Sequence, residues 1–157
     1  MNGMRIGQGF DVHRFADDER PLVLAGVTFV GERGLVGHSD ADAVAHAVSD
    51  ALLGAAGLGD IGSHFPDTDP KWKGANSMAI LRAVVAMVRA EGWQVANVDV
   101  NVICERPKIA PQREAMQTNL TQALGAPATV KGRRAEGLGA IGRTEGIACI
   151  AVALLTA

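Results

Sequence analysis

Three side chains in the first third of the chain could together hold a divalent metal ion. Asp11 and His13 lie two residues apart in a segment that alternates like a β-strand, so both side chains should project from one face. His46 follows in an alanine-rich segment with helical periodicity. Two imidazoles and one carboxylate suit a tetrahedral zinc ion whose fourth position stays open, which is typical of a catalytic zinc rather than a structural one.

The stretch Gly37–Gly62 is expected to position this metal site. We predict a helix from about Ser39, as a possible N-cap, to Gly54 or Gly57. A lone interior histidine is more often a hydrogen-bonded core residue, but ligand-type residues nearby favour a site. Carboxylates one turn either side of the histidine could orient its second ring nitrogen, and the sequence does not decide which one does. The polar stripe at four-residue spacing is His38, Asp42, His46 and Asp50.

The residues around this helix indicate a phosphorylated ligand. His38 and Ser39 would stand at the helix N-terminus, where free N–H groups and the helix dipole favour an anion. Ser39 could equally serve only as the cap, and the two roles are compatible. The loop Gly59–Gly74 is too long for a simple connection, and its carboxylates with an apolar rim suit the hydroxyl groups of a sugar or polyol.

Composition excludes several classes of function. The chain has 157 residues with 48% hydrophobic and 20% charged residues, which suits one soluble domain over residues 1–157. A net charge of -2 and the absence of tyrosine argue against a nucleic-acid partner. No segment has the apolar length of a signal peptide or a membrane span, so we expect a cytoplasmic protein. Cys104 and Cys149 are interpreted as reduced core residues.

The periodicity predicts an α/β fold of the α+β type. A mixed four- to five-stranded sheet should be backed by three helices, and the first two strands are expected to pair antiparallel. The second helix is predicted to be capped by Asn76 or Ser77 and stopped by Gly92, and the third to end at Leu124 before Gly125. The predicted strands cover residues 4–13, 22–30, 98–102, 128–133 and 147–155.

Four blocks of the sequence resemble, in order, the signature blocks of the 2-C-methyl-D-erythritol 2,4-cyclodiphosphate synthase family. The blocks are GFDVHRF, GHSDADAVAHAVSDALLGAAGLGDIG, FPDTDPKWKGA and GRTEGIA. The resemblance spans essentially the whole chain. It implies a homotrimer of α/β subunits with active sites between neighbours, which acts in the non-mevalonate isoprenoid pathway. The implied reaction converts 4-diphosphocytidyl-2-C-methyl-D-erythritol 2-phosphate to the cyclic diphosphate and releases CMP.

The resemblance also implies individual roles. It makes Asp11, His13 and His46 the ligands of one zinc ion per subunit, in agreement with the spacing argument, and Glu136 the ligand of magnesium or manganese. His38 would contact phosphate with Ser39 and stabilise the transition state. The remaining substrate-binding residues implied by the resemblance are Asp60, Ile61 and Gly62 for the ribose, Phe65, Asp67 and Asp69 for methylerythritol, Lys108 for the cytidine, and Arg143.

The chain departs from the family where many members carry a Thr-Thr-Thr-Glu run. Here the run reads Arg133-Arg134-Ala135-Glu136, so the threonine with a transition-state role is replaced by Arg134. A guanidinium can bind phosphate bidentately and could replace the hydroxyl contact. Ala140 replaces a phenylalanine that lines a cavity on the trimer axis in many members.

Two other functions remain open at this stage. The altered run from Arg133 to Ala140 is compatible with a non-catalytic zinc-containing paralogue that binds a nucleotide or an isoprenoid diphosphate. A general zinc phosphohydrolase would need a base to activate water, and the sequence offers no obvious one.

Overall fold

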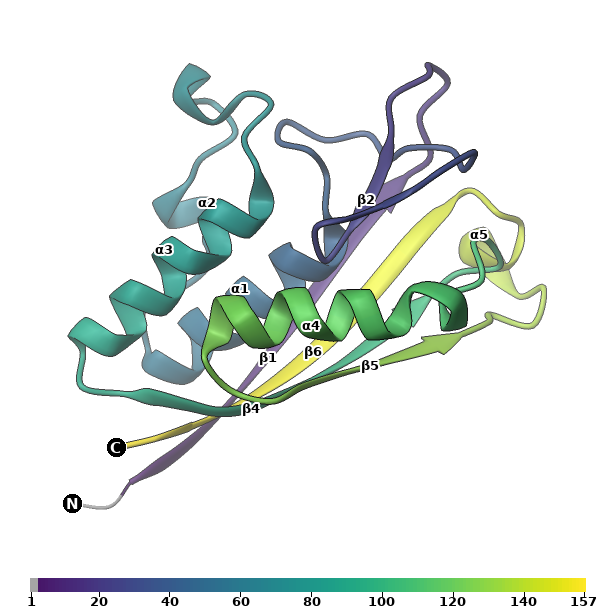
Figure 1. The fold of residues 1–157 in the computed structure, drawn as a ribbon. Coiled ribbons are helices and arrows are strands. Elements are labelled where there is room, and N and C mark those ends of the chain that lie inside the picture. Colours follow the sequence, from purple (N-terminus) through teal and green to yellow (C-terminus); the bar gives the residue numbers. More distant parts are fainter. Residues whose placement is uncertain (1–2) are drawn as a thin grey trace.

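Two long antiparallel strands form the centre of the fold. In a computed structural model of the chain, which describes residues 3–157, β1 (Met4–Arg14) and β6 (Gly146–Thr156) pair along their whole length. On the other side of β6, β4 (Gln94–Ile103) pairs antiparallel with it, and β5 (Ala128–Arg133) pairs parallel with β4. The result is the predicted mixed sheet, with four strands in the order β1-β6-β4-β5 (Figure 1).

Three longer helices cover one face of this sheet (Figure 1). Helix α1 (Ala43–Ala56) packs on β1 and β6, α3 (Ser77–Ala90) packs on α1, and α4 (Arg113–Leu124) packs on β5. Gly57 and Gly125 end α1 and α4 in the left-handed conformation; Gly125 was the predicted stop of its helix, and Gly57 was one of the two predicted for α1. Short one-turn elements lie in the loops: α2 (Ile61–His64), η1 (Pro70–Trp72), η2 (Ala110–Gln112) and α5 (Gly139–Gly142).

Alternate residues of β1 face α1. Gly7 and Gly9 lie on this side, and a Cβ atom at Gly9 would stand only 1.8 Å from the carbonyl oxygen of Ala47. Asp11 and His13 continue the same side of the strand because side chains alternate with period two. The missing glycine side chains therefore let α1 pack directly on the strand that carries two of the predicted metal ligands.

In the described residues 3–157, no helix covers the other side of the sheet (Figure 1). Its β4 residue Asp99 accepts a hydrogen bond from Thr129 and pairs with Lys131. Around this polar group the face is largely apolar and exposed, which is unusual for the surface of a monomer. We call it the bare sheet face, and its most exposed apolar residues are Met4, Ile6, Phe10, Val12 and Val152.

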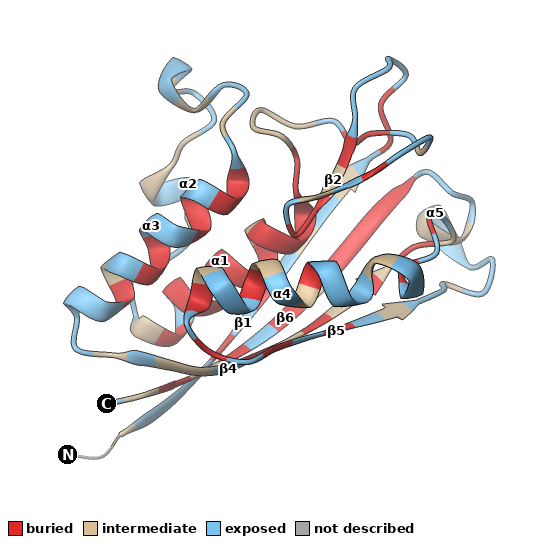
Figure 2. Ribbon diagram, viewed as in Figure 1, coloured by how far each residue is buried: buried red, intermediate tan, exposed pale blue. Residues whose placement is uncertain are grey.

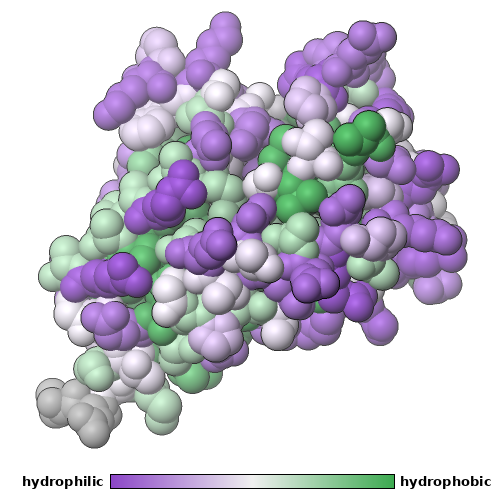
Figure 3. Space-filling view, viewed as in Figure 1, coloured by the Kyte–Doolittle hydropathy of each residue, from purple (hydrophilic) through white to green (hydrophobic). Residues whose placement is uncertain are grey.

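The core lies between the helices and the sheet, and polar side chains cover the loops. Buried residues concentrate along α1 and the facing strands (Figure 2). In the same view, hydrophilic side chains gather over the loops at the upper edge and at the right (Figure 3). Within residues 3–157, no helix combines the length and the apolar character that crossing a membrane requires.

The predicted second strand and its pairing were wrong. Residues 22–30 form a hairpin of two short strands, β2 (Leu22–Leu24) and β3 (Val27–Phe29), which pair with each other and not with β1. Ala25 and Gly26 break the run because both have positive φ angles, 51° and 72°. Their backbone N–H groups donate to the carboxylate of Asp42, each at 2.8 Å. The turn is therefore held by a residue far along the chain.

The predicted start of the central helix was also wrong. The N-cap is Asp42, whose side chain accepts from the N–H of Ala45, and not Ser39. Ala41 precedes it with a φ angle of 56°, which is incompatible with a right-handed helix. His38 consequently lies in a loop, and only two members of the predicted polar stripe, His46 and Asp50, lie within α1.

Candidate metal centre and active site

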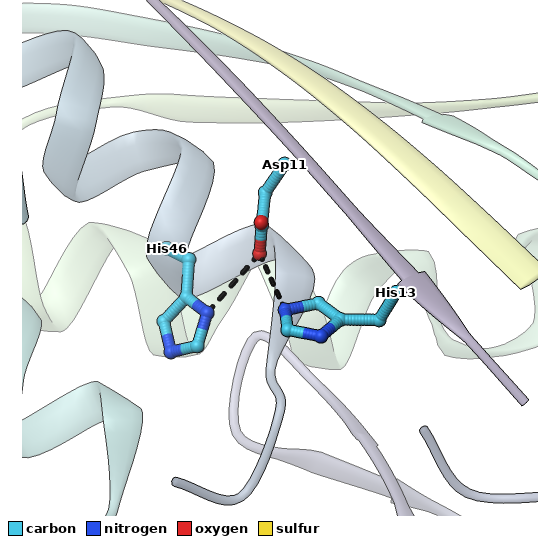
Figure 4. Close-up of side chains that lie close together, drawn as sticks. All are labelled: Asp11, His13 and His46. Carbon is cyan, nitrogen blue, oxygen red and sulfur yellow. Dashed lines mark hydrogen bonds and ion pairs between the residues drawn. The ribbon is translucent and has the colours of Figure 1, made fainter. Parts of the chain in front are cut away.

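The three predicted metal ligands converge on one point (Figure 4). Asp11 and His13 reach it from β1 and His46 from α1. The Oδ2 atom of Asp11 lies 2.8 Å from Nε2 of His13 and 3.1 Å from Nδ1 of His46, and the three donor atoms all lie within 4.8 Å of one another. Ligands of a tetrahedral zinc are separated by about 3.3 Å, so both distances from Asp11 are close to those that a zinc ion requires.

The hydrogen bond behind His13 supports a cation at this point. Its Nδ1 atom lies 2.7 Å from the carbonyl oxygen of Val36, which can only accept, so Nδ1 carries the proton. The lone pair of Nε2 then faces the Asp11 carboxylate, and two lone pairs at this distance require a metal ion or a proton between them. The residues present thus fit a divalent metal.

Without a metal, the same contacts shift both ionisation equilibria. Burial would raise the pKa of Asp11, but hydrogen bonds from His13 and His46, which form when protons occupy the nitrogens that face Asp11, outweigh burial and hold that pKa well below its usual range. Burial would lower the pKa of His13, but the Asp11 carboxylate outweighs it and raises that pKa. The site therefore attracts positive charge, whether from protons or from a metal ion.

The second ring nitrogen of His46 contacts two hydroxyl groups. Its Nε2 atom lies 2.8 Å from Oγ of Ser77 and 3.1 Å from Oγ of Ser39. The two carboxylates that the sequence offered for this role are engaged elsewhere, because Asp42 caps α1 and Asp50 accepts from the first N–H of α2. The expectation that one of them orients His46 was wrong.

A cavity of about 410 Å³ opens above this metal centre. Phe65 and Trp72 pack edge to face on one side of it, with ring centroids 4.9 Å apart. We call it the metal-side cavity. The predicted site residues that line it are His13, His38, Ser39, His46, Ile61, Gly62, Phe65 and Asp67.

Two predicted substrate carboxylates have structural contacts next to this cavity and do not line it. Asp60 caps α2 through the N–H of Ser63, and Asp69 caps η1. The Nε2 atom of His38 lies 3.2 Å from the carbonyl oxygen of Asp69 and donates to it. The argument that His38 and Ser39 use the free end of a helix to bind an anion was wrong, because Asp42 occupies that end.

A second cavity of about 690 Å³ is formed by the loop after β4 and the end of β5. Lys108 and Arg134 line it, and it shares no lining residue with the metal-side cavity. Glu105 accepts from Nε of Arg134 at 3.2 Å and from the N–H of Ala135 at 2.9 Å. Burial would raise the pKa of Glu105, but these donors and the N–H of Gly137 outweigh it, so that pKa is lowered.

The other two predicted site residues line neither cavity. Glu136 is exposed, and it has a φ angle of 54° in the turn that Glu105 holds. Arg143 is exposed and pairs with Glu145 at 2.7 Å. Their assigned roles remain predictions.

Sequence reasoning missed three residues of these sites. Ser77 is fully buried beside His46. Glu105 lines the second cavity and accepts hydrogen bonds from Arg134 and Ala135, and Trp72 lines the metal-side cavity. Ser77 had been interpreted only as a possible helix cap, and no local pattern joins it to a histidine 31 residues earlier. Glu105 and Trp72 lie in segments that the sequence had singled out, but only their contacts in the structure show what these two side chains do.

The fold and the site together define an α/β protein with a candidate metal centre beneath an open cavity. The YgbB family model matches residues 4–156. The chain belongs to the YgbB family.

Several relatives are similar over nearly the whole chain. A protein of Neisseria gonorrhoeae named 2-C-methyl-D-erythritol 2,4-cyclodiphosphate synthase is 53% identical over 99% of this chain and 98% of its own length. The bifunctional enzyme IspD/IspF of Anaeromyxobacter dehalogenans is 56% identical over 95% of this chain. The chain spans only 39% of that bifunctional relative.

Solved structures show the same fold. Bifunctional IspDF from Campylobacter jejuni superimposes with a TM-score of 0.95 at 44% identity, over 99% of this chain and 43% of that one. The IspF of Plasmodium falciparum, in a complex with CDP, superimposes with a TM-score of 0.85 at 37% identity, over 99% of this chain and 97% of that one. The expected α/β architecture is confirmed, and the mixed sheet, expected to have four or five strands, has four.

Proposed function

We propose that the protein is a 2-C-methyl-D-erythritol 2,4-cyclodiphosphate synthase. It converts 4-diphosphocytidyl-2-C-methyl-D-erythritol 2-phosphate to the 2,4-cyclodiphosphate and CMP, which makes it a phosphorus–oxygen lyase of the non-mevalonate isoprenoid pathway. The observation that carries the proposal is the convergence of Asp11, His13 and His46 beneath the metal-side cavity. Membership of the YgbB family and 53% identity to a synthase support it.

The reaction needs no nucleophile from the protein. An oxygen of the substrate's 2-phosphate attacks the β-phosphorus, and the bond from that phosphorus to the bridging oxygen breaks, so that CMP leaves with the electron pair. Zinc at the three ligands and magnesium or manganese at Glu136, when bound, would neutralise the charge on the phosphates. The chain's own contribution is to hold the two phosphate groups in line.

The residues of the two cavities divide the substrate between them. His38 and Ser39 bind phosphate at the edge of the metal centre. His38 stabilises the negative charge that develops on the phosphate oxygens in the transition state. The walls of the metal-side cavity bind the methylerythritol and ribose hydroxyl groups. Lys108 and the backbone of the loop from 104 to 110 hold the cytidine in the second cavity. Arg134, on the rim of that cavity, takes the place of a phosphate-binding threonine.

A homotrimer completes this proposal. An exposed apolar face such as the bare sheet face suits burial against further copies of the chain, and Phe10 on it is 56% exposed. Packing around a common axis would also unite the metal-side cavity of one subunit with the second cavity of its neighbour. We further propose a cytoplasmic location and a single domain over residues 1–157, of which residues 1 and 2 lie outside the described part. Two unpaired, buried cysteines suit such a reducing compartment.

Phosphorus NMR of the purified protein with the substrate and magnesium tests the function directly. The resonances of the cyclic diphosphate and of CMP should appear, and a zinc chelator should abolish them. Unchanged substrate despite bound zinc, with tight binding of CDP, would instead identify a non-catalytic nucleotide-binding paralogue. Sedimentation equilibrium should give three times the 16.3 kDa mass of the chain.

A further inference from the structure

We propose that Asp40 and Ser77 are positioning residues of the metal centre, because together they decide which nitrogen of His46 carries the proton. Ser77 is the first residue of α3 and is fully buried. Its Oγ atom lies 2.8 Å from Nε2 of His46 on one side and donates to Oδ1 of Asp40 on the other. The proposal rests on the metal-dependent function proposed above and specifies how one ligand is prepared for the ion.

The direction of these hydrogen bonds follows from counting protons. A serine hydroxyl has one proton, and Asp40 already accepts the backbone N–H of Ser77 at 3.1 Å through its other oxygen. The carboxylate therefore acts as the acceptor for both groups of Ser77. Because the single hydroxyl hydrogen of Ser77 points at Asp40, its oxygen must accept from His46, so Nε2 of His46 carries a proton.

This arrangement leaves the lone pair on the nitrogen that faces the metal. Nδ1 of His46 points at Oδ2 of Asp11, 3.1 Å away, and it can bind a cation only without a proton. In the opposite tautomer, Nδ1–H would block the ion, and Nε2 would lose its shorter hydrogen bond, to Ser77, and could accept only from Ser39 at 3.1 Å. The Asp40–Ser77 pair thus disfavours the tautomer that cannot bind metal.

The two histidine ligands are fixed by different means. The tautomer of His13 follows from a backbone carbonyl, that of Val36, which can only accept. A serine alone could donate or accept, so His46 needs the carboxylate behind it. The segment around Asp40 is itself held against the start of α3, because the N–H of Asp40 donates to the carbonyl of Ala75 at 3.1 Å. The carboxylate of Asp40 is therefore held in place beside Ser77, whose hydroxyl hydrogen it accepts.

Ser39 is left free for a different task. Its Oγ atom lies 3.1 Å from Nε2 of His46 and 3.2 Å from Oγ of Ser77. Since the hydroxyl of Ser77 donates its hydrogen bond to Asp40, only the hydroxyl hydrogen of Ser39 is uncommitted, and Ser39 lines the metal-side cavity. It can therefore donate to a phosphate oxygen without disturbing the tautomer of His46.

Ser77→Ala tests the proposal against a matched control. Ser49→Ala removes the hydroxyl of another fully buried serine, one that donates to the carbonyl of Ala45 within α1 and does not touch the metal centre. The zinc dissociation constant, measured by competition with a chromogenic chelator, should rise about 10- to 100-fold in Ser77→Ala. It should not change in Ser49→Ala.

A long-range ¹H–¹⁵N NMR spectrum of the zinc-loaded protein gives a readout that a merely structural role would not change. The Nε2–H resonance of His46 should be protected from exchange in the wild type and lost to solvent exchange in Ser77→Ala. Asp40→Asn provides a second variant of nearly equal volume, and it should also weaken zinc binding, because its amide can donate to Ser77 and reverse the hydrogen bond.

The outcomes separate the two proposals. If Ser77→Ala and Asp40→Asn bind zinc as tightly as Ser49→Ala and keep the Nε2–H resonance, the positioning role is overturned while the metal centre stands. A wild-type protein that binds no zinc would overturn the metal centre, and the positioning role with it.

Discussion

Gly9→Ala should pull the metal centre apart without changing any ligand. The added Cβ would lie 1.8 Å from the carbonyl oxygen of Ala47, whereas real Cβ contacts are essentially never shorter than 3.0 Å. The backbones of β1 and α1 must therefore separate by at least about 1.2 Å, because neither atom belongs to a flexible side chain. Asp11 lies two residues further along β1, and His46 precedes Ala47, so the ligands separate with their elements.

The expected losses are large in zinc affinity and moderate in stability. Metal–ligand distances tolerate errors of about 0.2 Å, and misplacing reacting groups by about 1 Å costs roughly 100-fold. We therefore expect the zinc dissociation constant to rise by about 100-fold or more. Overpacking should also lower the free energy of unfolding by about 1–3 kcal/mol. Chelator competition measures the first quantity and urea unfolding of the metal-free protein measures the second.

Gly54→Ala is the matched control on the same helix. Gly54 is exposed, and the nearest atom to its added Cβ would be the carbonyl oxygen of Gln8 at 4.0 Å. Alanine in a helix is favoured over glycine by about 1 kcal/mol, so this variant should be slightly more stable and bind zinc normally. The reasoning is refuted if Gly9→Ala keeps the wild-type zinc affinity, or if both variants lose it equally.

Three further predictions concern the second cavity and the helix cap. In Arg134→Thr, turnover should not increase, because the guanidinium already supplies the phosphate contact; a large gain in kcat would show that the arginine is no working substitute. In Glu105→Gln, the turn at 134–137 loses its ionised acceptor, so calorimetry should give several-fold weaker CDP binding with unchanged zinc binding. Burial raises the pKa of Asp42 from 3.8 to about 6 despite three N–H donors, so the stabilisation from its protonation is fully present below pH 3.8 and is lost as the pH rises through 6. A carboxyl ¹³C titration of Asp42 with a midpoint below 4 would contradict that shift.

Local patterns were sufficient where a single element determines the outcome. Asp11 and His13 share a face of β1 because strand side chains alternate, and the structure brings them together. Gly57 and Gly125 end their helices because glycine adopts the left-handed conformation of a helix end without the steric penalty of a Cβ atom. The class of fold followed from the same periodicities.

Local patterns failed where residues far apart compete for the same partner. Ser39 and Asp42 are both good N-caps, and the sequence alone favoured the earlier one. The structure selects Asp42 because its carboxylate also accepts from Ala25 and Gly26, and this one interaction both starts α1 and closes the hairpin. The error at the helix start and the error at the second strand thus have a common cause.

The same reasoning separates the metal-binding motif from the metal-binding site. Asp11, His13 and His46 can be recognised from spacing, but their separation depends on Gly9, and the tautomer of His46 depends on Ser77 through Asp40. A chain could keep all three ligands and still bind zinc poorly if the glycine or the serine were replaced. The contacts behind the ligands, rather than the ligands themselves, therefore set how well this fold can hold its metal.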